Sequence, residues 1–336
     1  MKSKFTEQKL GNEIKKNLPY SKTVLYLFAL AFFSGVLTVL IGTAVLPIGA
    51  ALLSTLLFFE KRAYKPLTVA VILVTVTLDT VLAVLAGTYV PTASLTLVCS
   101  VLVMFFCYRA GCSKGESAFY LTSVLVLLLG AGLVLDLFSE IGEYSLEALS
   151  AYVEETYIAL REEFVSTFSE LTVTLSDGSV QSLISADDAA NVFDGVASVS
   201  FAFAVIFCFA IAGIALMLYR TLLLRLSAEE EKVLRWRFSV TKPVAIFYLV
   251  VMLLSFFTGL DGEIFSVTLY NLYYIFMFVH AYIGLRFLFN LEAVRRRPFI
   301  IFLALSSIVM FTSAALALFS VMGAFLTFSQ ENKETV

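Results

Sequence analysis

The chain has 336 residues, of which 60% are hydrophobic and 15% are charged, and its formal net charge is −3. Soluble domains average about 45–50% apolar and about 25% charged residues, so the composition excludes an ordinary soluble protein. It predicts an all-α, polytopic helical membrane protein whose first partner is the lipid bilayer. No nucleic-acid surface is expected, because membrane topology accounts for the basic clusters.

Long apolar runs follow a basic arm of 22 residues that carries six lysines. A membrane-spanning helix needs about 20 residues. The first run is long enough for two short helices with a turn at Gly42 and Pro47, so the sequence predicts nine spans, and a single or double crossing by the last run stays open. The apolar runs occupy residues 23–59, 66–90, 92–108, 117–138, 196–219, 243–260, 266–290 and 298–328.

The distribution of lysine and arginine sets the predicted orientation. Cytosolic loops of membrane proteins collect these residues. With nine spans and the amino terminus inside, 21 of the 23 basic residues fall in cytosolic segments. The predicted location is the bacterial plasma membrane, with residues 136–195 outside; that segment holds 13 acidic residues and one basic residue, Arg161.

These assignments divide the chain into five predicted parts. They are a cytosolic basic arm (1–22), a first transmembrane bundle of five spans (23–138), an acidic extracytoplasmic helical hairpin (139–195), a second group of four spans (196–328) with a cytosolic interfacial helix at 228–238, and a short tail (329–336).

The acidic segment carries an amphipathic pattern. Apolar residues at three- and four-residue steps predict a helix of about eight turns from Ile141 to Leu171, whose stripe packs on the spans or on lipid headgroups. The SDGS stretch at 176–179 predicts a turn. Ser185 and Asp188 form a capping box that predicts a helix continuing into the span after 196.

A second capping box, Ser227 with Glu230, opens the short stretch AEEEKVLRWRF. One interpretation is an interfacial helix with the Trp236 ring at headgroup level and the charges of Arg235 and Arg237 toward phosphates. The other is a docking surface for a cytosolic or membrane protein partner. Both stay open.

A carboxylate inside an apolar run is the first candidate polar contact. Asp79 lies in VILVTVTLDTVLAVLAG, residues 71–87, where only threonines relieve the apolar surroundings. A carboxylate at a helix centre costs about 2.5–3.5 kcal/mol, so it faces a bundle interior or a water-filled cavity. It is either a ligand or ion contact or a polar clasp between helices.

The run at 266–290 carries the other candidates. At about 100° per residue, Asn271 and Tyr282 share one face, and His280 lies on the opposite face with Gly284. If either face met lipid, an amide or an imidazole would lie in the hydrocarbon. This helix is therefore predicted to be interior. Each polar residue is either a ligand contact or a hydrogen-bonded packing residue.

Small residues predict close packing elsewhere. Ala210, Gly213 and Ala215 crowd the sixth span, and such residues let helix backbones approach one another.

Catalytic and cofactor motifs are absent from the sequence. Nucleotide-binding, zinc-protease and hydrolase patterns do not occur. The four cysteines lack metal-ligand spacing, and His280 is the only histidine. We therefore expect no enzyme activity, no cofactor and no metal.

Four segments of the sequence resemble segments of a known family. They are LPIGAALLSTLLFFEKRAY at 46–64, YRAGCSKGESAFYLTSVLVLLLGAG at 108–132, LRWRFSVTKP at 234–243 and NLYYIFMFVHAYIGLRF at 271–287. On these segments the chain resembles a bacterial membrane family, DUF2232 or YybS-like proteins. Asn271 and Gly284 match a family pattern, whereas His280 is not carried over from it. The resemblance implies a first half similar to the S components of energy-coupling-factor vitamin transporters, with Pro47 in a short helix of that kind. Family members tend to be encoded beside a cyclic-dinucleotide phosphodiesterase, which implies a signalling or envelope role.

Two functions follow as hypotheses. In the first, the chain is transporter-like and binds a small molecule in an intramembrane cavity, with Asp79, Asn271, His280 and Tyr282 as candidate polar contacts. In the second, it is a non-enzymatic scaffold or assembly partner that acts through the acidic outer segment and the 228–238 helix.

Overall fold

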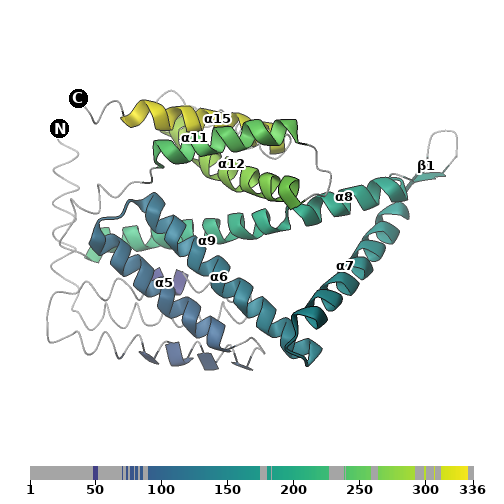
Figure 1. Cartoon of the computed structure of the whole chain (residues 1–336). Helices are drawn as coiled ribbons and strands as arrows, with labels where there is room; N and C mark the ends of the chain where they lie inside the picture. The colour runs from purple at the N-terminus through teal and green to yellow at the C-terminus, as the bar shows by residue number, and fades with distance from the viewer. Residues whose placement is uncertain are drawn as a thin grey trace. The chain divides into compact units, whose positions relative to one another are not determined.

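Helices make up nearly all of the described structure (Figure 1). The computed structural model describes residues 48–51, ten residues between 70 and 85, 90–174, 180–182, 184–226, 238, 240–258, 264–291, 299, 306 and 312–331. Its principal elements are α5 (Val90–Ala110), α6 (Lys114–Ile141), α7 (Leu146–Ser169), β1 (Thr172–Thr174), β2 (Val180–Ser182), α8 (Ala186–Ser198), α9 (Ser200–Leu226), α11 (Lys242–Phe257), α12 (Ile264–Asn290) and α15 (Thr312–Glu331). The predicted all-helical class is confirmed for these residues, apart from one two-stranded hairpin that the sequence analysis did not predict.

Three described helices are long and apolar enough to cross a membrane. Their apolar lengths are Lys114–Ile141, Ser200–Leu223 and Ile264–Phe289. At about 1.5 Å per residue each exceeds the roughly 30 Å hydrocarbon core of a bilayer. Shorter apolar helices occur at Ser94–Ala110, Lys242–Phe257 and Ala314–Phe328. The predicted runs at 117–138, 196–219 and 266–290 thus correspond to α6, α9 and α12.

The chain divides into two compact units. The first comprises Met1–Leu137 and Phe207–Ser239, and the second comprises Phe138–Ile206 and Val240–Val336.

The first unit is built around side chains of α5, α6 and α9. Leu97, Met104, Leu121 and Leu216 are fully buried in one cluster. Dense packing of such side chains against one another holds a group of helices together. In α9 the small residues Ala212 and Ala215 are also fully buried, and they belong to the same cluster.

A tight turn joins α5 to α6. Gly111 ends α5 with φ +81°, a left-handed conformation that favours glycine, while Cys112 N–H donates to the Cys107 carbonyl at 2.9 Å. Ser113 then caps α6, because the Glu116 N–H donates to its hydroxyl and the Glu116 carboxylate accepts from the Ser113 N–H at 2.6 Å. This reciprocal box is an S-x-x-E signature that the sequence analysis missed.

In the second unit, α11, α12 and α15 pack side by side (Figure 1). Thr241 precedes α11 as its N-cap, with a proline in the first turn where the missing N–H costs nothing. Tyr248 of α11 and Met277 of α12 are buried in the cluster that these helices share with Ala324 of α15.

Two glycines let α12 and α15 touch backbone to backbone. A Cβ on Gly323 would lie 2.0 Å from the His280 carbonyl oxygen, and a Cβ on Gly284 would lie 2.1 Å from the Phe319 carbonyl oxygen. No heavier residue fits either position without moving a helix, so this crossing sets the distance between the two helices.

The acidic segment forms a separate arm of the second unit, defined as α7, β1, β2 and α8. The strands pair antiparallel with Thr172 opposite Ser182 and Thr174 opposite Val180. They flank the SDGS stretch, which lies outside the described residues. The predicted eight-turn helix is corrected: Gly142, at φ +75°, ends the preceding helix, and α7 begins only after its N-cap Ser145.

The second half of the arm follows the predicted capping box. Ser185 is the N-cap of α8, and its hydroxyl accepts from the Asp188 N–H at 3.1 Å and donates to the Asp188 carboxylate at 2.6 Å. The predicted continuation into the span is interrupted at Val199, a single turn residue between α8 and α9. Tyr157 and Phe164 of α7 pack against Phe193 of α8, and no α7 residue is fully buried.

We predict that Gly323→Ala destabilises the protein and that Gly213→Ala does not. The new methyl at 323 would clash with backbone, and overpacking of this kind costs about 1–3 kcal/mol. Within the described structure a Cβ on Gly213 meets nothing within 4 Å, so this glycine makes no close helix contact there. Its replacement by alanine favours the helix by about 0.5–1 kcal/mol. Thermal unfolding in detergent measures both, and equal midpoints for the two variants would disprove the glycine crossing.

Candidate functional site

Polar side chains on opposite faces of α12 make two different environments. The face predicted to carry Asn271 meets the junction of α8 and α9, and the face predicted to carry His280 meets α11 and α15. Both residues are buried, with exposed fractions of 7% and 0%. Each of the two faces of this helix therefore buries its polar residue.

Asn271 bridges two helices with its whole amide. Its Oδ1 accepts from the Ala202 N–H at 2.7 Å, and its Nδ2 donates to the Ser198 carbonyl at 2.7 Å and to the Val267 carbonyl at 2.8 Å. The first two groups belong to the break between α8 and α9, where helix ends leave backbone groups without intrahelical partners. Asn271 thus ties the base of the arm to α12, and its polar atoms are already occupied.

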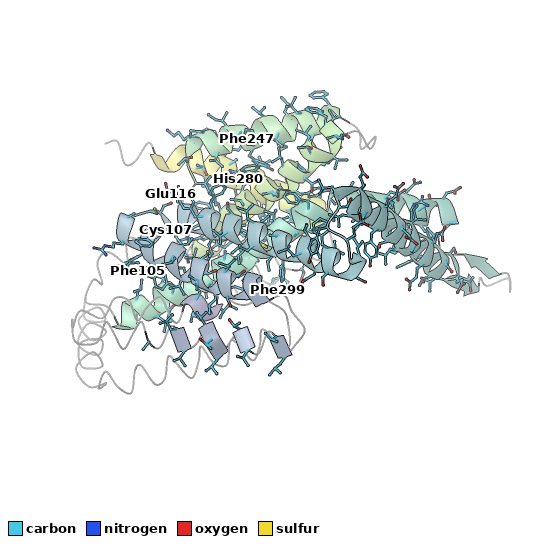
Figure 2. The ribbon with its side chains drawn as sticks, turned by 60° about the horizontal axis from the view of Figure 1, so that its bottom comes forward. Phe105, Cys107, Glu116, Phe247, His280 and Phe299 are labelled. Atoms are coloured by element: carbon cyan, nitrogen blue, oxygen red, sulfur yellow. The ribbon has the colours of Figure 1, made fainter. Side chains whose placement is uncertain are left out.

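His280 lies at the centre of the α11–α12–α15 group (Figure 2). Its Nδ1 lies 2.8 Å from the Phe276 carbonyl. A carbonyl only accepts, so this bond places the proton on Nδ1, and in the neutral ring Nε2 is left as an acceptor. Nε2 is fully buried and has no hydrogen-bond donor within the described structure.

The surroundings of His280 are aromatic and apolar. The Tyr248 ring stacks on the imidazole with centroids 4.6 Å apart and planes at 16°, and Tyr273 stacks on Tyr248 with centroids 6.4 Å apart. Tyr248 Oη and Ser320 Oγ lie 2.5 Å apart, and Ser320 also donates to the Ala317 carbonyl at 2.7 Å. Neighbouring hydroxyls are thus paired with each other or with backbone, whereas the imidazole keeps one free acceptor.

The structure does not gather the predicted contacts into one site. Asn271 and His280 face different neighbours and are nine residues apart, about 13 Å along the helix. Tyr282 is 42% exposed. Asp79 and the three residues Arg235, Trp236 and Arg237 lie outside the described residues.

Tyr248, Ser320 and Gly323 belong to the His280 environment and were not predicted. Each is a polar or small residue inside an apolar run, which is the signal that singled out His280 itself. Pairing them requires knowing which helices are neighbours, and one sequence without that knowledge does not specify it.

Some polar residues that follow Asp79 in the sequence belong to the described structure. Thr80 donates to the Val76 carbonyl at 2.7 Å, and its hydroxyl also contacts the Ser94 hydroxyl of α5. Farther along α5, the Ser100 hydroxyl is fully buried and has no hydrogen-bond partner in the described part of the chain.

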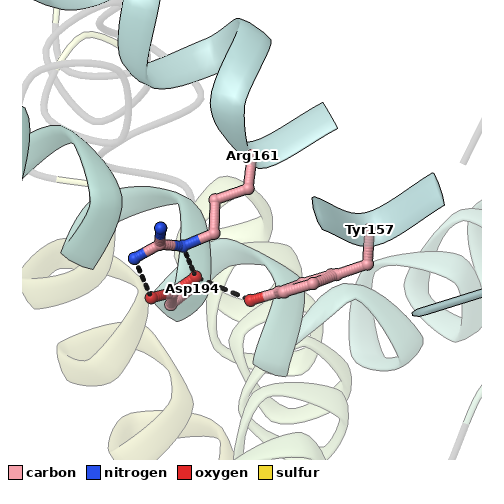
Figure 3. A network of polar contacts seen from close by, with 3 residues as sticks. All are labelled: Tyr157, Arg161 and Asp194. Atoms are coloured by element: carbon pink, nitrogen blue, oxygen red, sulfur yellow. Dashed lines mark hydrogen bonds and ion pairs between the residues drawn. The ribbon is translucent and has the colours of Figure 1, made fainter. Parts of the chain in front are cut away.

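The arm holds the one ion pair found among the described residues (Figure 3). Arg161 of α7 donates to both carboxylate oxygens of Asp194 of α8, at 2.8 and 3.2 Å, and the Tyr157 hydroxyl donates to the same carboxylate at 2.6 Å. These hydrogen bonds, first from Arg161 and then from Tyr157, hold the pKa of the Asp194 carboxyl below its usual range. The same carboxylate raises the pKa of Tyr157 by accepting its hydroxyl hydrogen.

No group of three or more His, Cys, Asp or Glu side chains suited to a metal ion occurs within the described structure.

The chain matches no protein-family model, no curated protein and no solved structure.

We predict that Asp194→Asn loosens α7 from α8. A depressed carboxyl pKa contributes stability above the unfolded pKa of about 3.9, and this contribution disappears as pH falls through the folded pKa. The α7–α8 contact of the natural protein is therefore more stable than that of Asp194→Asn at pH 5–8. The two proteins become equally stable only in stronger acid. Hydrogen exchange of α7 and α8 over a pH series measures the pH dependence.

Trypsin gives a second readout at pH 8, because Arg161 is the only Lys or Arg in residues 136–195. Cleavage after Arg161 should accelerate several-fold in Asp194→Asn and stay unchanged in the control Glu154→Gln. Equal cleavage of all three proteins would show that the ion pair does not hold the helices together.

Proposed function

We propose that the chain is a multi-pass bacterial plasma-membrane protein of transporter-like type that binds a small molecule inside the membrane. The proposed layout has nine spans, a cytosolic amino terminus and the 136–195 segment outside. The asymmetry of basic residues and the three helices long enough to cross a bilayer support it. The resemblance of the first bundle to S components is a further argument for the transporter-like class.

The layout predicts where added reagents reach the chain. In intact cells, a membrane-impermeant thiol reagent should label Ser150→Cys of the arm and leave Glu230→Cys unlabelled until the membrane is opened. The natural sequence treated with the same reagent controls for reaction at the four existing cysteines. Labelling of position 230 and protection of position 150 in intact cells would reverse the orientation.

The free acceptor of His280 carries the binding proposal. A buried polar group without a partner costs about 1–3 kcal/mol, and that cost is removed when a bound molecule donates to it. Because Nδ1 already donates to Phe276, the ligand must bring an N–H or O–H group to Nε2. Stacked tyrosines beside the imidazole favour a molecule that is otherwise mostly apolar.

Binding without catalysis is the proposed activity, with no cofactor. His280 supplies recognition through one hydrogen bond, and its position is set by the Phe276 carbonyl and by the stacked Tyr248 ring. Asp79 remains a proposed second polar contact on the evidence of the sequence alone.

A second candidate function is a membrane scaffold or assembly partner. The observation that favours it is the amide of Asn271, which fixes the base of the acidic arm to α12 and so presents the arm from a defined anchor. In this function the partner is a membrane or cytosolic protein rather than a small molecule.

His280→Phe tests the small-molecule function. Phenylalanine keeps a ring against Tyr248 but removes both imidazole nitrogens, so we expect the amount of co-purifying small molecule to fall at least tenfold while the folded protein is recovered. Mass spectrometry of molecules released from the purified protein measures retention, and thermal unfolding in detergent reports folding.

Thr268→Val is the matched control, since it removes one hydroxyl from an exposed position of the same helix. The proposed small-molecule binding is contradicted if no small molecule co-purifies with the natural protein. It is also contradicted if His280→Phe retains the same molecule at the same stoichiometry.

A further inference from the structure

The arm exposes apolar side chains that nothing in the described structure covers. Val153 and Leu160 of α7 are 49% and 52% exposed, and Val192 and Val196 of α8 are 52% and 56% exposed. We call these four residues the apolar arm face. They lie next to the helix–helix contact, where Phe164 of α7 packs on Phe193 of α8 with ring centroids 5.5 Å apart.

Helix geometry places all four on the same side of the arm. At about 100° per residue, Val153 and Leu160 lie roughly 40–60° before the centre of the α7 contact face, and Val192 and Val196 lie on the corresponding side of α8. The two helices run antiparallel, so positions that precede the contact centre on each helix share one side. Arg161 and Asp194 both follow that centre, and their ion pair accordingly lies on the other side.

Charge defines what the apolar arm face can accept. Glu163 borders it on α7 and Asp188 borders it on α8, and both are exposed. Arg161, the only cation in residues 136–195, is engaged by Asp194 on the opposite side. The face is therefore an apolar strip with an acidic residue on each edge. The only cation of residues 136–195, Arg161, lies on the other side of the arm.

We propose that the apolar arm face binds a cationic amphipathic segment of a partner protein. Such a segment places its apolar side chains on the strip and its Lys or Arg residues against Glu163 and Asp188, so that apolar contact is combined with electrostatic complementarity at the edges. A second copy of the arm would bring acidic edges together, and anionic lipid headgroups would repel the same carboxylates. This inference is independent of the His280 binding site.

A synthetic peptide tests the proposal on the full chain. The protein is placed in nanodiscs of neutral phosphatidylcholine and titrated with a fluorescent 18-residue Leu/Lys amphipathic peptide, with a Leu/Glu peptide of the same pattern and empty nanodiscs as controls. We expect saturable binding of the Leu/Lys peptide that weakens with added salt, and no binding of the Leu/Glu peptide.

Matched variants separate the face from the general acidity of the arm. Val153→Ser with Leu160→Ser should weaken peptide binding about tenfold, and Glu163→Lys should do the same. Ile158→Ser and Glu154→Lys make like changes on the other side of α7, and we expect them to alter binding less than threefold.

Three results would overturn the proposal. The first is equal weakening by the two sets of variants, which would assign binding to overall charge. The second is dimerisation in light scattering that Val153→Ser with Leu160→Ser abolishes and Ile158→Ser preserves, which would assign the face to a second copy. The third is absence of peptide binding by the natural protein. If that protein instead binds phosphatidylglycerol vesicles, the face is assigned to lipid.

Discussion

The second unit depends on the direct contact between the backbones of α12 and α15 at Gly284 and Gly323. In a lipid environment apolar side chains gain little by leaving lipid for protein, so helix association relies on close van der Waals packing and on polar contacts between helices. Two facing glycines provide that packing, because each admits a carbonyl oxygen where a Cβ would stand. The register of α15 on α12 follows from them.

That register determines what surrounds His280. Its own carbonyl is the group that approaches Gly323, so the imidazole lies at the level where α15 comes nearest. Ser320, one turn before Gly323, is then positioned to meet the Tyr248 hydroxyl of α11, and the Tyr248 ring covers the imidazole. The imidazole consequently lies inside the unit, and its Nε2 is buried.

The two polar residues of α12 differ in how many of their hydrogen bonds are made within the protein. Asn271 and His280 have the same standing in the sequence, as single polar side chains in an apolar run. In the fold, the Asn271 amide meets backbone groups released by the break at Val199, and it is used completely. The His280 imidazole meets helices whose own backbone bonds are intact, so only its Nδ1 finds a partner, within its own helix.

Much of the helix layout is determined by the sequence alone, because the length and apolarity of a run and the local chemistry of a helix end act within a few residues. The runs that became α6, α9 and α12, the Ser185 cap and the two-faced character of α12 are of this kind. The Ser113–Glu116 cap was equally readable, whereas the break between Ile141 and Ser145 was missed because apolar periodicity passes through it. Tertiary structure alone decided which side chains of α7 meet α8 and that a close glycine contact lies at Gly284 and Gly323. It also decided that the Asn271 amide is hydrogen-bonded through both Oδ1 and Nδ2, whereas His280 Nε2 has no donor in the described structure. Each of these depends on which surfaces far apart in the chain come into contact. Hydropathy and periodicity do not specify those contacts.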